Sequence, residues 1–180
     1  MAEPLSCVIT PSLRHSTAIK LISRSLLDTL AIKAAASPRH RAHHNIHEAA
    51  EDVVQRFFVV GDRDTYFRPH RHLTKAELAV VLRGRFDVLT FDDAGKVTAR
   101  YSIGEDSQEF AYELPPATWH TLLACTDGST FLEIKQGPYD PATAAQFASW
   151  APAEGDTQVP EFLDWLRDAQ PGTCVPTLGS

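Results

Sequence analysis

The spacing of apolar residues changes along the chain, from a helical repeat near the N-terminus to short strand-like runs after Val53. From Ser16 to about Ile32 they recur every three or four positions, which predicts an amphipathic helix. Ser16 can cap the start of this helix, and Pro38 lies beyond its end. We expect the helix to cover one face of the domain, with a partner-binding helix as the alternative. The apolar positions are Ile19, Leu21, Ile22, Leu26, Leu27, Leu30 and Ile32.

The runs after Val53 are rich in β-branched and aromatic residues, which is typical of strands. They are VVQRFFVV, ELAVVLRG, RFDVLTF, KVTARYSI, QEFAYEL, WHTLLAC and STFLEIKQ. The sequence DDAG between two of them predicts a hairpin. Short strands with turns indicate an antiparallel sandwich or barrel, and no strand–helix alternation supports a parallel sheet. After Pro138 the chain becomes polar and proline-rich, and PEFLDWLRDA predicts a short final helix.

Composition narrows the class of protein. A chain of 180 residues that is 43% hydrophobic suits one domain with its own core. The net charge is −6 and no basic stripe is visible, which argues against nucleic-acid binding. Cys7, Cys125 and Cys174 form no CxxC pair, which favours a reducing compartment. Without a signal-peptide pattern or an apolar run near ~18 residues, we expect a cytoplasmic protein that does not enter the membrane.

Three histidines and one glutamate are the candidate metal ligands. His70 and His72 are two positions apart, so on a strand they point to the same face. Glu77 begins the next apolar run, where a hairpin would fold it back beside them, and His120 begins a later run. Each feature alone is common on exposed strands. Together, three imidazoles and a carboxylate suit a divalent first-row metal and leave positions open for water or substrate.

The first motif resembles that of the cupin superfamily, which has the form HxH, three or four residues, Glu, six residues, Gly. Here these positions are His70, His72, Glu77 and Gly84. The resemblance implies a small antiparallel β-barrel of jelly-roll type, with an N-terminal and a short C-terminal helix beside it. It also implies one metal ion per chain, held by His70, His72, Glu77 and His120; zinc, iron, nickel and manganese all suit this set.

The second cupin motif, Pro-x-Gly-x-x-His, is similar to the stretch from Pro115 to His120. Ala117 stands where glycine is usual, and the usual asparagine after the histidine is absent. Because alanine disfavours positive φ, we expect this turn to avoid a strongly positive φ. The substitution affects the expected turn geometry more than the expected ligand.

Several stretches are similar to those of the WbuC-type cupin-fold metalloproteins: SPRHRAHHNIHE, VVQRFF, YFRPHRH, WHTLLA and EIKQGPYDP. The similarity runs from about Ser37 to Pro141, and this family is associated with surface-polysaccharide gene clusters. It implies three parts: residues 1–36 as tail and packing helix, 37–141 as the cupin barrel, and 142–180 as an extension with a short helix. Cupin barrels commonly pair through their sheets, so we also expect a homodimer.

The run HRAHHNIH, from His40 to His47, holds four of the eight histidines. Since the barrel set already supplies four ligands, we expect no metal here and expect His40, His43 and His44 to be solvated. The positions similar to the family are Arg39, Arg41, Asn45 and His47. An arginine fork binds carboxylate or phosphate, so the run could clamp an anion or sugar over the barrel mouth. Alternatively, its arginines anchor the fold by pairing with acids such as Glu48 or Glu51.

Three functions stay open at this point. The first is a metal-dependent isomerase or epimerase of a sugar or sugar-derived acid, linked to surface-polysaccharide biosynthesis, with His47 or Tyr66 as candidate bases. The second is an Fe(II)-dependent oxygenase. The third is a non-catalytic sugar-binding or regulatory cupin. In each case we expect a small-molecule ligand, such as an anionic sugar. The residues expected to bind it are Arg41, His47, Arg56, Tyr66 and Lys135.

Overall fold

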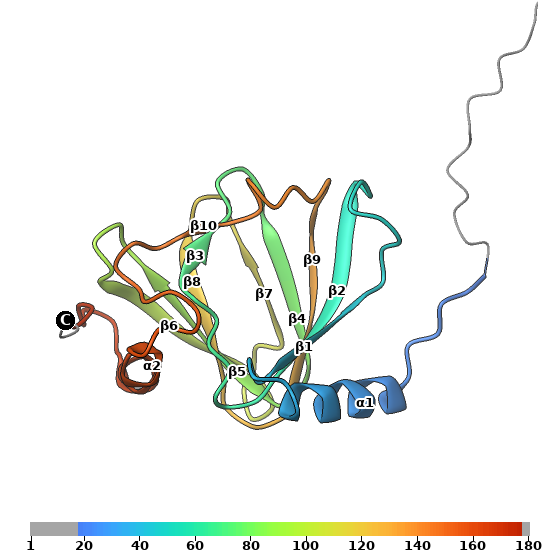
Figure 1. Ribbon diagram of the computed structural model, residues 1–180, viewed down its shortest axis with the longest axis horizontal. Coiled ribbons are helices and arrows are strands. Elements are labelled where there is room, and N and C mark those ends of the chain that lie inside the picture. The colour runs from blue at the N-terminus through green and yellow to red at the C-terminus, as the bar shows by residue number, and fades with distance from the viewer. Residues whose placement is uncertain (1–17, 178–180) are drawn as a thin grey trace, which may run out of the picture.

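The computed structural model describes residues 18–177. The proposed tail, the helix cap at Ser16 and Cys7 lie outside the described residues. The described chain forms two five-stranded antiparallel sheets and two helices (Figure 1). Neither helix within these residues is long and apolar enough to cross a membrane. The helices are α1 (Arg24–Ala35) and α2 (Val159–Asp168).

Each sheet combines strands that are distant in sequence. The first sheet has the order β1-β2-β9-β4-β7 and consists of β1 (Arg41–Asn45), β2 (Val54–Gly61), β9 (Ser129–Gln136), β4 (Glu77–Arg83) and β7 (Ala111–Leu114). The second has the order β10-β3-β8-β5-β6 and consists of β10 (Gln146–Phe147), β3 (His70–Arg71), β8 (Trp119–Ala124), β5 (Arg85–Phe91) and β6 (Val97–Gly104).

The two sheets pack against each other through an apolar core. Phe131 of β9 and Phe86 of β5 meet edge to face, with ring centroids 5.2 Å apart. Val59, Ala79, Val88 and Leu122 belong to the same buried cluster. No strand ladder within residues 18–177 joins the sheets, so the predicted barrel of jelly-roll type takes the form of a two-sheet sandwich that does not close. The mainly β, antiparallel class is as predicted.

The strand and turn predictions hold best where the apolar pattern is strongest. β5 and β9 coincide with RFDVLTF and STFLEIKQ. DDAG forms the predicted β5–β6 hairpin, in which the Asp92 amide donates to the Lys96 carbonyl at 3.0 Å. β1 and β10 were not predicted as strands, since neither carries an apolar run.

The first helix begins later than predicted, at Arg24 instead of Ser16. Ser23 is its N-cap, with a side-chain oxygen that accepts a hydrogen bond from the Leu26 amide at 3.2 Å. Residues 18–23, just before it, are not helical, and Ile19 and Leu21 are 86% and 85% exposed. The apolar spacing around them therefore does not reflect a buried helix face.

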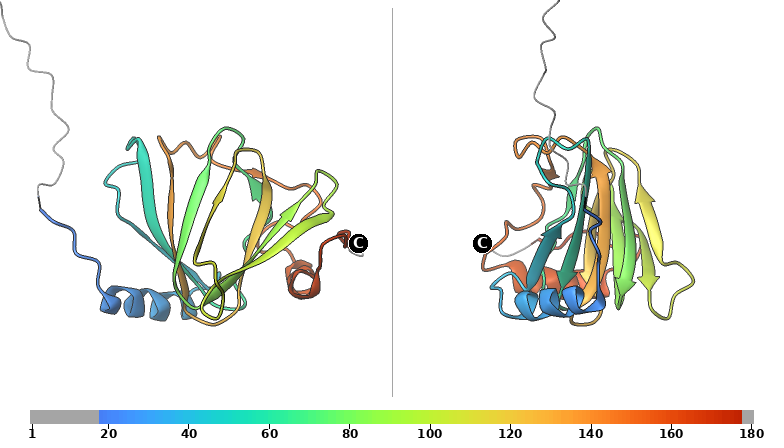
Figure 2. Two further views of the ribbon diagram at one scale, coloured as in Figure 1. Left: turned by 180° about the vertical axis from the view of Figure 1, so that it is seen from behind. Right: turned by 90° about the vertical axis from the view of Figure 1, so that its right-hand side faces the viewer.

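The two helices lie at opposite sides of the sandwich (Figures 1 and 2). α1 packs beside β1 and β2, where Leu27 and Leu30 join a buried cluster with Phe58 and Val60. α2 packs beside the second sheet, where Phe162 and its neighbours join the cluster of Leu89, Phe91 and Trp119. Both outer faces thus gain an apolar cover, while the space between the sheets remains available for a site.

Candidate metal centre and cavity

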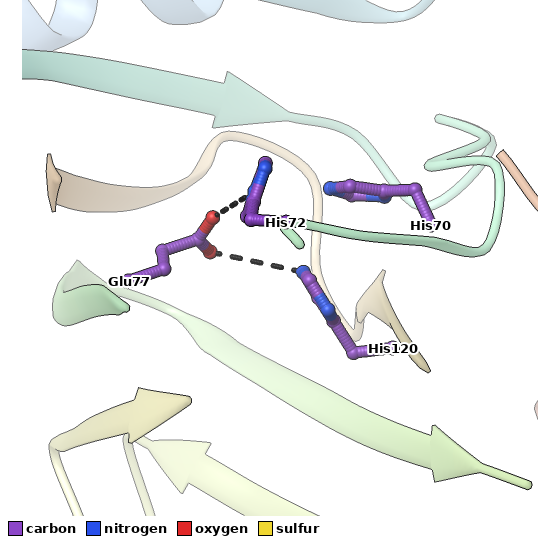
Figure 3. A group of neighbouring side chains, drawn as sticks. All are labelled: His70, His72, Glu77 and His120. Carbon is purple, nitrogen blue, oxygen red and sulfur yellow. Dashed lines mark hydrogen bonds and ion pairs between the residues drawn. The ribbon is translucent and has the colours of Figure 1, made fainter. Parts of the chain in front are cut away.

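Four side chains converge between the sheets: His70, His72, Glu77 and His120 (Figure 3). Each offers one ligand atom, and these atoms all lie within 4.8 Å of one another. His70 of β3 pairs with His120 of β8 in the second sheet, and His72 follows β3 directly. His72, Glu77 and His120 are buried, and His70 is half-buried.

Glu77 reaches this group from the other sheet. It is the first residue of β4, which pairs with β7 and β9 in the first sheet, whereas β3 belongs to the second. The predicted hairpin between the HxH pair and Glu77 is therefore wrong. The chain between His72 and Glu77 instead crosses from one sheet to the other, so the four side chains bridge the sandwich.

Backbone carbonyls orient all three imidazoles. The Nδ1 atoms of His70 and His120 each lie 2.9 Å from a carbonyl oxygen, of Arg68 and Thr118 respectively. The Nδ1 atom of His72 lies 2.5 Å from the carbonyl oxygen of Ala144. Because a carbonyl only accepts, these contacts assign the proton to Nδ1 and leave the Nε2 lone pair free. This is the tautomer of a metal-binding histidine oriented by an outer hydrogen bond.

The ligand atoms that face one another, the Nε2 atoms and the Glu77 oxygens, have too few hydrogen-bond partners within the protein. His120 Nε2 is buried with no hydrogen-bond partner and lies 4.0 Å from Glu77 Oε1. His72 Nε2 lies 2.8 Å from Glu77 Oε2, although its Nδ1 already donates to Ala144. A divalent cation would satisfy the lone pairs and the carboxylate together, so the donor set fits a metal ion.

The pKa values of His70, His120 and Glu77 favour the protonation states that metal binding requires. Burial lowers the pKa of His70 to about 3 and also lowers the pKa of His120. Burial alone would raise the pKa of Glu77, but the hydrogen bond from His72 and the nearby imidazoles lower it below its usual range. Two neutral imidazoles and an ionised carboxylate thus coexist near neutral pH, and no proton need be displaced from them.

The turn before His120 differs from the expectation. Ala117 has a φ of 64°, so the prediction that this turn avoids positive φ is wrong. Its amide donates to the His72 carbonyl at 2.7 Å. The left-handed conformation costs an L-residue roughly 1–2 kcal/mol. The turn keeps it because it connects β8 to the backbone of His72.

A cavity of about 330 Å³ is lined by three of the four side chains, His70, His72 and Glu77, and is called the site cavity below. Apolar residues, including Phe67, Leu122 and Phe131, line part of its wall. Its charged residues, besides Glu77, are Arg39, Arg41, Arg68, Glu133, Lys135 and Glu154. Polar groups that converge beside an apolar wall are typical of small-molecule sites, and here the charged share of the lining is large.

Two of the five predicted ligand-binding residues line the site cavity. Lys135 pairs with Glu133, with Nζ 2.5 Å from Oε1. Burial and the charge of Glu77 raise the pKa of Glu133, while Lys135 opposes that rise. The Arg41 side chain is only 8% exposed and donates to the Tyr66 carbonyl and to Glu154.

The other three predicted residues do not line the site cavity. Tyr66 is buried and donates its hydroxyl to the Pro152 carbonyl at 3.0 Å. Burial raises its pKa, which does not suit a base. Arg56 is 45% exposed and lies 3.9 Å from Asp52. His47 Nδ1 contacts the backbone of Arg56, and its ring lines a side pocket of about 360 Å³ next to the site cavity.

The histidine run is part of the first sheet. It was predicted as a segment before the first strand, but Arg41–Asn45 is β1 itself, paired with β2. Arg41 and His43 line the site cavity, whereas His44 stacks on Phe58 with ring centroids 6.4 Å apart. Among residues 18–177, the group around Glu77 is the one cluster suited to a metal, and it contains none of the run.

Sequence reasoning missed two charged residues of the cavity, Arg68 and Glu154. Arg68 is two positions before His70, so strand alternation could have placed it on the same face. Glu154 accepts hydrogen bonds from both Arg39 and Arg41, although it lies more than 100 positions away in the chain. No local pattern in the sequence around Glu154 indicates this contact.

Comparisons with known proteins show the fold. A family model described as a domain of unknown function (DUF6016) matches residues 22–103. No curated protein sequence matches the chain. The structure of CapF with the inhibitor 3-isopropenyl-tropolone is 16% identical at a TM-score of 0.52, and the match covers 62% of this chain and 32% of that one. The capsular polysaccharide assembling protein CapF from Staphylococcus aureus is 17% identical at a TM-score of 0.51, covering 62% and 30%.

The CapF neighbours are cupin-fold proteins. This chain has a cupin-like fold. KdgF from Halomonas sp. also matches, at 18% identity and a TM-score of 0.45, with 59% of this chain and 86% of that chain covered. The chain spans about a third of the length of the CapF chains that it matches. The His₃Glu cluster of this chain is a group that could hold a metal ion.

Proposed function

We propose that this protein is a metal-dependent enzyme of the WbuC type that isomerises or epimerises a sugar or sugar-derived acid. One observation carries the proposal: three oriented Nε2 atoms and a carboxylate converge at the wall of a cavity of about 330 Å³. His70, His72, Glu77 and His120 would hold the ion. Four protein ligands leave positions open on a six-coordinate ion, next to the space where a ligand would bind.

A bound divalent ion would polarise a carbonyl or hydroxyl oxygen of the ligand and so acidify the neighbouring C–H bond. The chain would supply the remaining functions. Glu133 and Lys135 line the same cavity as an ion pair and are the candidates for moving a proton. Phe67, Leu122 and Phe131 would exclude water from the reacting atoms.

Surface-polysaccharide sugars are the proposed substrate class. The resemblance to WbuC-type proteins favours them, and the S. aureus fold neighbour is described as a capsular polysaccharide assembling protein. A first panel should therefore contain sugars and sugar acids from surface glycans.

We also propose a cytoplasmic homodimer that pairs through a sheet edge, since β1 and β7 end the first sheet. A monomer mass from light scattering at micromolar concentration would contradict the dimer.

The test combines metal analysis with isotope exchange. Purified protein should contain close to one divalent ion per chain, measured by inductively coupled plasma mass spectrometry, and any co-purified ligand should be identified by mass spectrometry. An isomerase or epimerase incorporates solvent deuterium into its substrate in D₂O, and the His72→Ala variant should not. Oxygen uptake without exchange would favour the oxygenase alternative. Ligand binding with neither exchange nor uptake would favour a non-catalytic binding protein.

A further inference from the structure

Arg41 is a buried cation with an incomplete set of partners. Its side chain is 8% exposed and lines the site cavity. One terminal nitrogen donates to the Tyr66 carbonyl at 3.1 Å, and the other donates to Glu154 at 2.9 Å. Its Nε is buried without a hydrogen-bond partner, and the guanidinium lies 4.8 Å from the centre of the Phe67 ring. A buried guanidinium with an unmatched donor is costly unless a further acceptor reaches it.

Glu154 is the carboxylate that pairs with this arginine. It accepts two hydrogen bonds from Arg39, at 2.5 and 2.6 Å, and one from Arg41 at 2.9 Å. Planar arginine forks bind the carboxylate or phosphate of a ligand with the same geometry. Glu154 and Arg39 are 37% and 53% exposed, whereas the Arg41 side chain is 8% exposed. The buried Arg41 is therefore the enclosed part of the arrangement, and Glu154 is the part that solvent and a ligand can reach.

The surrounding charges favour an anion. Four basic and three acidic side chains line the site cavity, and a divalent metal would add two further positive charges. Lys135 pairs with Glu133, and Glu77 faces the metal centre, so Glu154 is the acid that faces the arginines. Arg68 lines the same cavity, and its Nε is also buried without a partner. Its Nη2 donates to both the Ala148 and the Ala151 carbonyls, in the segment that leads to Glu154.

We propose that Arg39 and Arg41 form an anion subsite of the cavity, and that the Glu154 carboxylate occupies it until the carboxylate or phosphate group of a ligand displaces it. The inference rests on the proposed role of the cavity as a ligand site, and it specifies an acidic or phosphorylated sugar. Glu154 neutralises Arg41 in the absence of ligand. The same contact makes Glu154 a competitor for every anionic ligand.

The experiment compares the native full-length chain with Glu154→Gln. Three probes are titrated by calorimetry: glucuronate, glucose 1-phosphate and neutral glucose. Glu154→Gln keeps the shape of the side chain but removes its charge, so we expect at least one anionic probe to bind about tenfold tighter or more, or roughly 1.4 kcal/mol. The probe that gains distinguishes a carboxylate from a phosphate subsite. Glucose affinity should not change.

Two further variants make the result specific. Arg41→Lys in the Glu154→Gln background keeps the charge but loses the fork, and it should remove most of the gain. Glu161→Gln makes the same substitution at an exposed position of α2 and should leave all three affinities unchanged. Thermal melting checks that each variant is folded, and Arg41→Lys alone provides a second test if the double variant is unstable, because it should weaken anion binding to the native chain.

The outcomes separate this inference from the proposed function. The titrations are made on metal-loaded protein and on protein treated with a chelator. A gain for Glu154→Gln in both states supports the anion subsite even if no turnover is found. Anion affinities that are equal in the native chain and Glu154→Gln, or no anion binding by either, would overturn the subsite whatever the metal content.

Discussion

His40, His43, His44 and His47 lie within eight positions of one another, whereas His70, His72 and His120 come from two separate stretches of chain. The dense group does not form a metal cluster, and the dispersed group brings its ligand atoms within 4.8 Å of one another and of Glu77. Strand geometry explains the difference. Adjacent residues of β1 point to opposite faces, so His43 lines the site cavity while His44 stacks on Phe58.

The two groups also differ in how their rings are held. In the dispersed group, each Nδ1 faces a carbonyl oxygen, which leaves Nε2 free as a ligand. In the dense group, His47 Nδ1 lies close to both the amide and the carbonyl of Arg56, so its proton cannot be assigned in the same way. Fixed orientation by a second contact, in addition to proximity, distinguishes a ligand from a histidine that is merely nearby.

The largest expected effect is on metal content, which should depend on the dispersed histidines and not on the dense group. His72→Ala removes one of four ligands and leaves Glu77 buried beside fewer partners, so bound metal should fall from about one ion per chain to near zero. The fold should persist, because the apolar clusters supply most of the stability of a domain of this size. The double variant His43→Ala/His44→Ala is the control and should keep the native metal content. Metal analysis after gel filtration measures both, and full occupancy in His72→Ala would contradict the ligand assignment.

Chelation should have the next largest effect, on thermal stability. A metal present at about 100 times its dissociation constant contributes roughly 2.7 kcal/mol, which corresponds to about 5–10 °C in Tm for a chain of this length. Native protein should lose this increment on addition of EDTA. The His72→Ala variant should not respond, whereas His43→Ala/His44→Ala should respond like the native protein. An equal loss of Tm in His72→Ala would mean that the chelator acts elsewhere.

A smaller effect should come from the turn beside the metal centre. Ala117→Gly removes the strain of a φ of 64° while keeping the amide that donates to His72. We expect a gain of about 0.5–1 kcal/mol in the free energy of unfolding, less than the full strain because glycine also frees the unfolded chain. Ala117→Val should instead destabilise, since β-branched residues avoid this region. Urea unfolding distinguishes the two; a loss of stability in Ala117→Gly would show that the conformation is not strained.

The smallest effect is expected on the outer face of β1. His44→Ala removes the stack on Phe58 from a half-buried position, and it should change the free energy of unfolding by no more than about 0.5 kcal/mol. Metal content should not change. A matched loss of metal in this variant would remove the distinction drawn between the two histidine groups.

The strands with strong apolar patterns could be predicted from the sequence, and β5 and β9 were found to the residue. β1 could not, because a strand of arginine, histidine and asparagine derives its conformation from pairing with β2. The helix start was misplaced because Ile19 and Leu21 share the helical spacing yet remain exposed. Periodicity identifies a face that could be buried, but only the tertiary contacts decide whether it is.

The residues of the site could likewise be predicted only in part. The HxH-to-Glu spacing and the later Pro115–His120 stretch together identified four residues that the structure brings together. The path between His72 and Glu77 was wrong, because β3 and β4 lie in different sheets. Lys135 and Arg41 line the site cavity, whereas Tyr66 and Arg56 point elsewhere. Glu154 was missed because its contact with Arg41 spans most of the chain. Residues within a motif can be tested against a known pattern, but a contact such as that of Arg41 with Glu154, where Glu154 belongs to no motif, cannot.

The crossing of the chain between His72 and Glu77 has a mechanical consequence. Because the histidines belong to one sheet and the glutamate to the other, a bound ion would cross-link the two layers. The layers could then separate at this point only when the ion leaves. Amides of β3, β4 and β8 should therefore exchange with deuterated solvent more slowly in metal-loaded protein, while β1 and β6, at the edges of the two sheets farthest from Glu77 and His70, should exchange at the same rate in both states.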